Sequence, residues 1–182
     1  MQRLDLATTP ATPWKNGGGT TRELLAWPAA TDWLLRLSVA RIDADGPFSA
    51  YPGISRWFAV LSGGGVELSW PHRRAQVGVS VGTAPLHFDG GDAPGCRLLA
   101  GPTEDLNLML RDSRARGALQ PVQGSAAWAG RGTWRCVYTA SACALHGGGI
   151  TTGYAHIVSG GILVSYGQEV VVGQQIAAKL TA

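Results

Sequence analysis

The strongest constraint on the fold is the punctuation of the chain by glycine and proline. The 182 residues include 26 glycines and 10 prolines, which divide the sequence into short apolar segments. Segments such as Asp32–Ile42, Ser55–Gly63 and Glu104–Leu110 have the length of β-strands, and Asp89–Gly95 is typical of the turns between them. The connections are too short for the crossovers that parallel strands need. The sequence therefore predicts an all-β protein built from antiparallel strands.

Composition and charge exclude several classes of protein. With 45% apolar and 15% charged residues, the chain is expected to fold rather than to be disordered. The net charge is only +3, and we interpret the basic cluster Arg111–Gly117 as a solvated loop, so no nucleic-acid partner is expected. No apolar run is long enough to span a bilayer, and the first residues lack the apolar stretch of a signal peptide. We therefore expect a cytoplasmic protein with no membrane partner.

Two of the predicted strands have faces of different polarity. In one strand Asp105, Asn107 and Met109 share a face, and leucines occupy the other face. In another, Arg36 and Ser38 interrupt an otherwise apolar strand. The first polar row is compatible with either water or the lumen of a barrel. Arg36 is either an edge-strand residue or a charge retained for a ligand.

The stretch PWKNGGGTTRE, at Pro13–Glu23, is the most unusual motif. It does not fit a phosphate-binding P-loop, because Lys15 precedes the glycines and the residues that follow read as a strand. A turn into that strand explains the glycines and Asn16. It leaves Trp14 and Lys15 unexplained, which favours a role for them in lining a site.

Several blocks together carry a resemblance to a known family. They are PWKNGGGTTRE, then FSAYPGISR inside Trp33–Leu68, then HFDGGD and DLNLMLR. In this order they resemble the HutD/Ves family of cupin-like proteins over about residues 1 to 115. The resemblance implies a cupin-like (RmlC-like) antiparallel β-barrel of the bicupin or jelly-roll type. It also implies an association with histidine utilisation and the binding of a small acidic metabolite such as N-formylglutamate.

The predicted domain organisation has two parts. Residues 1–120 form a HutD/Ves-like cupin lobe, and residues 121–182 form a β-rich segment that is either a second lobe or a divergent tail. The segment His146–Leu180 resembles a fragment of LytM-type zinc endopeptidases, but without the His-x-x-x-Asp and His-x-His ligands of their metal. That resemblance implies a scaffold only.

A metal site is not expected. Cupin metal sites use a His-x-His pair with a further His and a carboxylate. No two of the four histidines, His72, His87, His146 and His156, are separated by one residue. The three cysteines lack metal-site spacing and are expected to be reduced. We therefore predict no metal and no cofactor.

The family blocks bring together groups suited to an anion. Arginine binds carboxylates with a two-pronged fork, and ligand sites combine apolar walls with a few polar groups. The predicted ligand-binding residues are Trp14, Lys15, Asn16, Arg22, Arg36, Phe48, Arg56, His87 and Asn107, with Trp57 and Phe88 as further apolar walls. The alternative function is a cofactor-free isomerase or lyase that uses His87 as a base. The expected partner is a small carboxylated metabolite, and a homodimer is the assembly we consider.

Overall fold

The chain divides into two compact units. The computed structural model describes residues 2–127, 134–139, 143–148, 155–158, 161–166 and 169–181. One unit is Pro10–Arg114, here called the central unit, and the other combines Met1–Thr9 with Ala115–Ala182, here called the terminal unit. Every strand pairing recorded in the described residues is antiparallel, as the turn-rich sequence predicts. The terminal unit thus takes in the first residues of the chain as well as its last third.

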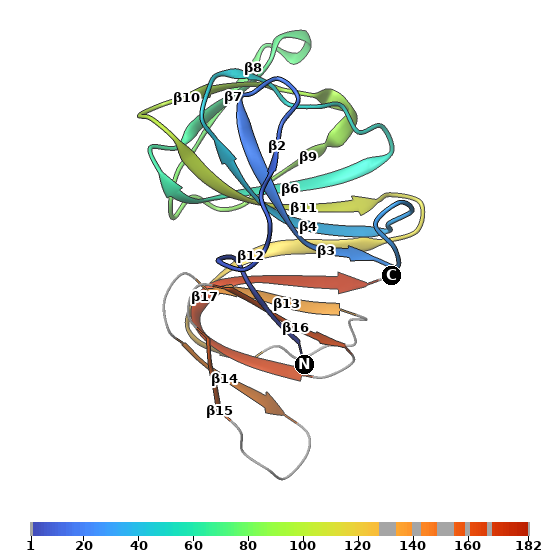
Figure 1. Ribbon diagram of the computed structural model, residues 1–182, viewed down its shortest axis with the longest axis vertical. Helices are drawn as coiled ribbons and strands as arrows, with labels where there is room; N and C mark the ends of the chain where they lie inside the picture. The colour runs from blue at the N-terminus through green and yellow to red at the C-terminus, as the bar shows by residue number, and fades with distance from the viewer. Residues whose placement is uncertain are drawn as a thin grey trace. The chain divides into compact units, whose positions relative to one another are not determined.

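The central unit consists of two sheets (Figure 1). The six-stranded sheet has the order β2-β3-β4-β11-β6-β9, and the four-stranded sheet has the order β5-β10-β7-β8. The strands of the first sheet are β2 (Thr12–Pro13), β3 (Gly19–Trp27), β4 (Leu35–Ile42), β6 (Ile54–Gly63), β9 (Leu86–Asp89) and β11 (Thr103–Arg111). Those of the second are β5 (Gly46–Pro47), β7 (Val66–Trp70), β8 (Ala75–Val79) and β10 (Gly95–Leu98). The 3₁₀ turn η1 (Pro71–Arg73) joins β7 and β8 within the four-stranded sheet, and η2 (Gly90–Asp92) connects β9 of the first sheet to β10 of the second.

The terminal unit is organised around β17, whose partners are β12, β13 and β14. Its described strands are β1 (Gln2–Asp5), β12 (Arg116–Ala127), β13 (Trp134–Thr139), β14 (Cys143–Gly148), β15 (Ala155–Val158), β16 (Gly161–Tyr166) and β17 (Glu169–Thr181). Residues 149–154, 159–160 and 167–168 of the segment that resembles LytM endopeptidases lie outside the described residues. No helix within the described ranges has the length and apolar character needed to cross a membrane.

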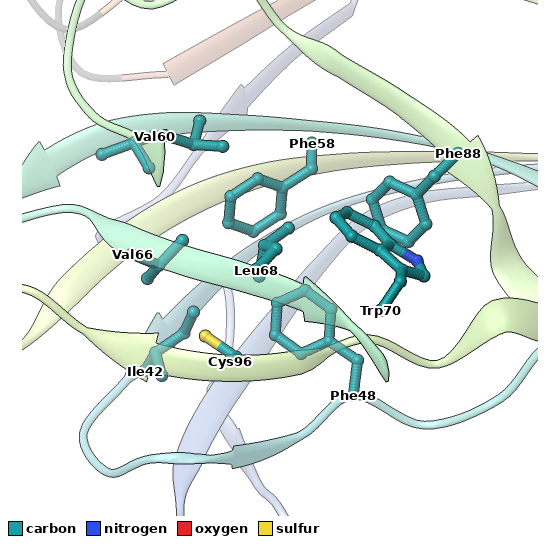
Figure 2. Packing of buried hydrophobic residues seen from close by; sticks show 10 residues of the cluster. Ile42, Phe48, Phe58, Val60, Val66, Leu68, Trp70, Phe88 and Cys96 are labelled. Atoms are coloured by element: carbon teal, nitrogen blue, oxygen red, sulfur yellow. The ribbon is translucent and has the colours of Figure 1, made fainter. Parts of the chain in front are cut away.

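Apolar side chains from both sheets form the core of the central unit (Figure 2). Phe58 is fully buried, and the Phe48 ring lies 5.6 Å from it between ring centres. The Trp70 ring packs edge-on against Phe88, also at 5.6 Å. Such tilted and edge-on pairs are the preferred arrangements of aromatic rings. The aromatic cluster therefore holds the two sheets together and forms a rigid floor beside the cavity described below.

The register of the six-stranded sheet places polar residues of neighbouring strands on one face. Asn107 of β11 lies opposite Ser38 of β4, and Met109 lies opposite Arg36. Because residues directly opposite each other point to the same side of a sheet, the polar rows predicted for these two strands form a single surface. The leucines of both strands, including Leu37 and Leu108, are fully buried on the other side of the sheet.

Candidate functional site

A cavity of about 740 Å³ opens on the polar surface of the six-stranded sheet. This volume lies within the range of roughly 300–1,000 Å³ that is usual for small-molecule sites. The cavity is lined by residues from the loop before β3, from β3, β4, β6 and β11, and from the segment that contains β5. The lining residues are Thr12, Pro13, Trp14, Lys15, Asn16, Thr21, Glu23, Arg36, Ser38, Ala40, Pro47, Phe48, Ser49, Tyr51, Arg56, Asp105, Asn107 and Met109.

Arg56 is the buried cation of this cavity. Its side chain is only 6% exposed, and its guanidinium carbon lies 4.4 Å from the centre of the Phe48 ring and 5.4 Å from that of Phe88. Both distances allow cation–π attraction. Burial lowers the pKa of Arg56 to about 10, an effect that the nearby Asp105 opposes. Arg56 therefore remains a cation at neutral pH.

Asn107 connects Arg56 to Asp105. The Nε atom of Arg56 donates a hydrogen bond to Asn107 Oδ1 over 2.8 Å, and Asn107 Nδ2 donates to Asp105 Oδ1. All three side chains are buried, and Asp105 is 1% exposed. Burial raises the pKa of Asp105 to about 8, although the Arg56 cation opposes the shift. The carboxyl group is therefore largely neutral at pH 7.

A second guanidinium lies on the other side of β11, because Arg36 of β4 and Arg56 of β6 both pair with Met109. Arg36 Nε donates to Glu23 Oε2 over 2.7 Å, and Arg36 Nη1 lies 4.0 Å from the sulfur of Met109. This ion pair is partly exposed, with 19% of the Arg36 side chain and 39% of the Glu23 side chain accessible. Exposed pairs of this kind contribute little to stability, so Glu23 exchanges readily for another acceptor.

The loop that carries the WKNGGG motif forms the rim of the cavity. Trp14 Nε1 donates to Thr21 Oγ1 over 2.7 Å, and Asn16 Oδ1 accepts from the Gly18 amide. Gly17 adopts the left-handed conformation with φ of +71°, as tight turns often require. A Cβ atom on Gly19 would lie 2.1 Å from the carbonyl oxygen of Arg41, so only glycine allows this approach to β4. Glycine at these positions thus allows the loop to pack closely against the sheet.

The cavity brings together most, but not all, of the residues selected from the sequence. Seven of them line it: Trp14, Lys15, Asn16, Arg36, Phe48, Arg56 and Asn107. Phe88 contributes through its ring beside Arg56 rather than as a lining residue. Arg22, His87 and Trp57 are absent from the lining. Ligand binding by any of these residues stays a prediction.

Arg22, which was selected from the sequence as a ligand-binding residue, does not line the cavity. Arg22 lies opposite Val39, whereas Glu23 lies opposite Ser38, and Glu23 is the residue of this pair that lines the cavity. The cause is a bulge: the register between β3 and β4 shifts at Leu24. A bulge inserts one extra residue and reverses the alternation of side chains beyond it. Counting alternate residues back from Ala26, which pairs with Arg36, therefore gives the wrong face for Arg22.

His87 belongs to a different cluster. It pairs with Trp57 across β9 and β6, and the two rings stack with centres 4.6 Å apart. Its Nε2 atom lies 2.6 Å from Ser55 Oγ. Trp57 and Ser55 alternate with Arg56 on β6, so they point away from the cavity side of that strand. The isomerase or lyase hypothesis needs His87 as a base within the site, and this position gives it no support.

The lining does not fit the metal site of a cupin enzyme. All lining residues fall within the described central unit, and none of them is a histidine or a cysteine. The two carboxyl groups, Glu23 and Asp105, share the cavity with Arg36 and Arg56, whose positive charges oppose a divalent cation. More widely, the described residues contain no cluster of three or more His, Cys, Asp or Glu side chains placed to hold a metal ion.

Some lining residues were not among the predicted ligand-binding set. Asp105 and Met109 share a row with Asn107, and Ser38 shares one with Arg36, so strand alternation was the signal that points to them. Tyr51 comes from the loop before β6, and its backbone amide donates to the Gly90 carbonyl oxygen. No periodicity in the sequence marks a loop residue of this kind.

Sequence relatives include proteins named Ves and a protein of a hutC region. The chain is 34% identical over 128 residues to Protein Ves of Citrobacter koseri, which covers 66% of this chain and 63% of that protein. It is 32% identical over 127 residues to an uncharacterised 21.2 kDa protein in the hutC 3′ region of Pseudomonas putida, covering 69% of this chain and 66% of that protein. The match thus spans a little under two thirds of the length of these relatives.

Solved structures confirm the expected all-β, cupin-like fold. A conserved protein of unknown function from Pseudomonas aeruginosa PAO1 has a TM-score of 0.87 at 26% identity, covering 100% of this chain and 98% of that one. HutD from Pseudomonas fluorescens SBW25, in a formate condition, has a TM-score of 0.83 at 26% identity, covering 99% and 97%. Oxalate decarboxylase from Lactobacillus farciminis has a TM-score of 0.67 at 9% identity, covering 99% and 85%, which is a likeness of fold alone. The HutD family model matches residues 6–156, and the chain therefore belongs to the HutD family.

Proposed function

We propose that this protein binds a small carboxylated metabolite in the cavity of its central unit and thereby tunes histidine utilisation in the cytoplasm. N-formylglutamate is the leading candidate for the ligand. Binding depends on protein side chains alone, without a metal or cofactor.

The buried guanidinium of Arg56 supports this proposal most directly. Its recorded hydrogen bond within the described residues runs from Nε to Asn107, which leaves the Nη1 and Nη2 edge for a ligand. A guanidinium held between aromatic rings is poorly hydrated, so an incoming carboxylate replaces little water and gains a charge-assisted hydrogen bond. Arg56 is thus suited to grip a carboxylate at the bottom of the cavity.

The remaining charges favour a ligand with a second acidic group. Lys15 and Arg36 line the same cavity, and the carboxylate of Glu23 forms an ion pair with Arg36 in the absence of a ligand. A second ligand carboxylate can replace Glu23 there, because the exposed ion pair is weak. The relatives fit this chemistry: one lies in a hutC region, and the HutD structure from Pseudomonas fluorescens is described in a formate condition, formate being the smallest carboxylate.

Calorimetric titration with N-formylglutamate, glutamate and formate tests the proposal. The substitution Arg56→Ala is expected to weaken binding by roughly ten- to a hundredfold, as the loss of a charge-assisted hydrogen bond predicts. Arg36→Ala is expected to weaken binding of the two dicarboxylates more than that of formate.

Arg97→Ala is the matched control. Arg97 pairs with Glu67 on the exposed side of the four-stranded sheet and does not line the cavity, so its removal is expected to leave binding unchanged. A wild-type protein that binds none of the three acids would refute the proposed function. Equal loss of binding in Arg56→Ala and Arg97→Ala would refute the assignment of the site.

A further inference from the structure

Asp105 is the lining residue whose presence an anion site does not explain. Carboxylates repel anionic ligands, yet this side chain is among the most deeply buried of the cavity, at 1% exposure. Its partner is the amide of Asn107 rather than a guanidinium, because Arg56 Nε donates to the other end of that amide.

The direction of the hydrogen bonds fixes where a proton on Asp105 lies. Arg56 Nε only donates, so Asn107 must present Oδ1 to it and Nδ2 to Asp105. Asp105 Oδ1 accepts the bond from Nδ2, and the proton of a neutral Asp105 is therefore carried by Oδ2. A neutral carboxylic acid held in an apolar site is a strong hydrogen-bond donor to an oxyanion.

The groups around Asp105 set its charge. Those with an electrostatic influence on it are Arg56 of β6 and Glu104, its neighbour on β11. Cys96 of β10 is close enough for Asp105 to help raise the pKa of its thiol, and β4 presents Ala40 and Ser38 opposite β11. The other charged or titratable residues of the cavity are Lys15, Glu23, Arg36 and Tyr51. With Asp105 neutral, three cations face one ionised carboxylate, a balance that suits a ligand with two negative charges.

We propose that Asp105 is a ligand-binding residue that acts in its acid form, donating a hydrogen bond from Oδ2 to the ligand carboxylate held by Arg56. This inference rests on the proposed function and extends it. The proton stays on Asp105 in the complex, and no covalent bond is formed. The site then binds its ligand together with a proton whenever Asp105 is ionised beforehand.

The pH dependence of affinity measures this coupling. Because the free carboxyl group has a pKa of about 8, the dissociation constant for N-formylglutamate is expected to rise about tenfold per pH unit above that value and to be nearly flat below it. The ligand carboxylates are fully ionised throughout this range, so they contribute no pH dependence. Titrations between about pH 6 and about pH 9, where Arg56 with its pKa of about 10 stays a cation, give both the slope and the number of protons taken up when buffers of different ionisation enthalpy are used.

Two variants separate Asp105 from the other groups. Asp105→Asn keeps the acceptor for Asn107 and places an amide donor near Oδ2, so binding is expected to persist with the slope abolished. Glu23→Gln removes the other carboxylate of the cavity, and its slope is expected to match that of the wild type. As a measurement that needs no variant, the carboxyl ¹³C resonance of Asp105 is expected to titrate in the free protein and to remain in the acid form in the saturated complex.

The outcomes distinguish this inference from the proposed function. Three outcomes would overturn the role of Asp105 and leave the anion site intact. They are wild-type binding whose affinity does not change with pH, a pH dependence that persists in Asp105→Asn, and an ionised Asp105 in the saturated complex. If the wild type binds none of the acids, the proposed function fails, and this inference fails with it.

Discussion

Asp105 is also expected to make the stability of the protein depend on pH in a specific way. In the folded protein its pKa is about 8, whereas its ordinary value is 3.8. Between these values the folded state holds a proton that the unfolded state has released. Unfolding therefore releases a proton, and the contribution of Asp105 to stability falls as the pH rises.

The size of this change in stability follows from the release of one proton on unfolding. A single proton corresponds to about 1.4 kcal/mol of unfolding free energy per pH unit, so the change between about pH 5 and about pH 7 is about 3 kcal/mol. Asparagine has nearly the same shape and does not ionise. The free energy of unfolding of Asp105→Asn relative to the wild type is therefore expected to increase by about 3 kcal/mol over this interval.

Urea denaturation followed by tryptophan fluorescence measures this difference at each pH. Asp112→Asn is the control, because Asp112 is exposed on the surface, and its difference from the wild type is expected to stay constant. A constant difference for Asp105→Asn as well would show that the folded protein does not hold Asp105 in its acid form. A difference that is constant over this interval, and falls with rising pH only below about pH 4, would mean that Asp105 is a carboxylate stabilised by Arg56.

Two further predictions concern the framework of the cavity. Phe58→Ala is expected to lower the free energy of unfolding by about 3 to 5 kcal/mol, since the side chain is fully buried, and a loss below about 1 kcal/mol in urea denaturation would contradict its place in the core. Gly19→Ala is expected to lower the free energy of unfolding by about 1 to 3 kcal/mol, because its Cβ would meet the Arg41 carbonyl oxygen. Gly46→Ala is the control, since a Cβ at Gly46 would meet nothing within 4 Å. Equal melting temperatures of the two variants would contradict the close approach of Gly19 to Arg41.

The sequence predicted the strands of the central unit and the polar rows on two of them. Alternation placed Asn107 with Asp105 and Arg36 with Ser38, but a single strand does not reveal whether its polar face meets water or a cavity. That choice depends on the register between β4 and β11, which sets the two rows side by side. Register is a property of paired strands, and it is fixed by turns and bulges distant from the polar residues.

Other features of the site depend on contacts that no local pattern encodes. The raised pKa of Asp105 results from burial beneath a cavity that several strands and loops build together. His87 lies in a family block and near two aspartates in the sequence, and yet its strand turns it towards Trp57 and Ser55. Proximity along the chain was therefore a poor guide to which titratable groups share the cavity.

The bulge at Leu24 makes the charge of the pocket depend on strand register. In a regular ladder that continued from Leu25 without the bulge, Leu24 would lie opposite Ser38 and Arg22 opposite Ala40, so Arg22 would turn inwards and Glu23 outwards. One negative side chain would leave and one positive side chain would enter, without any substitution. The position of a bulge thus sets the charge of a ligand site independently of which residues the strand contains.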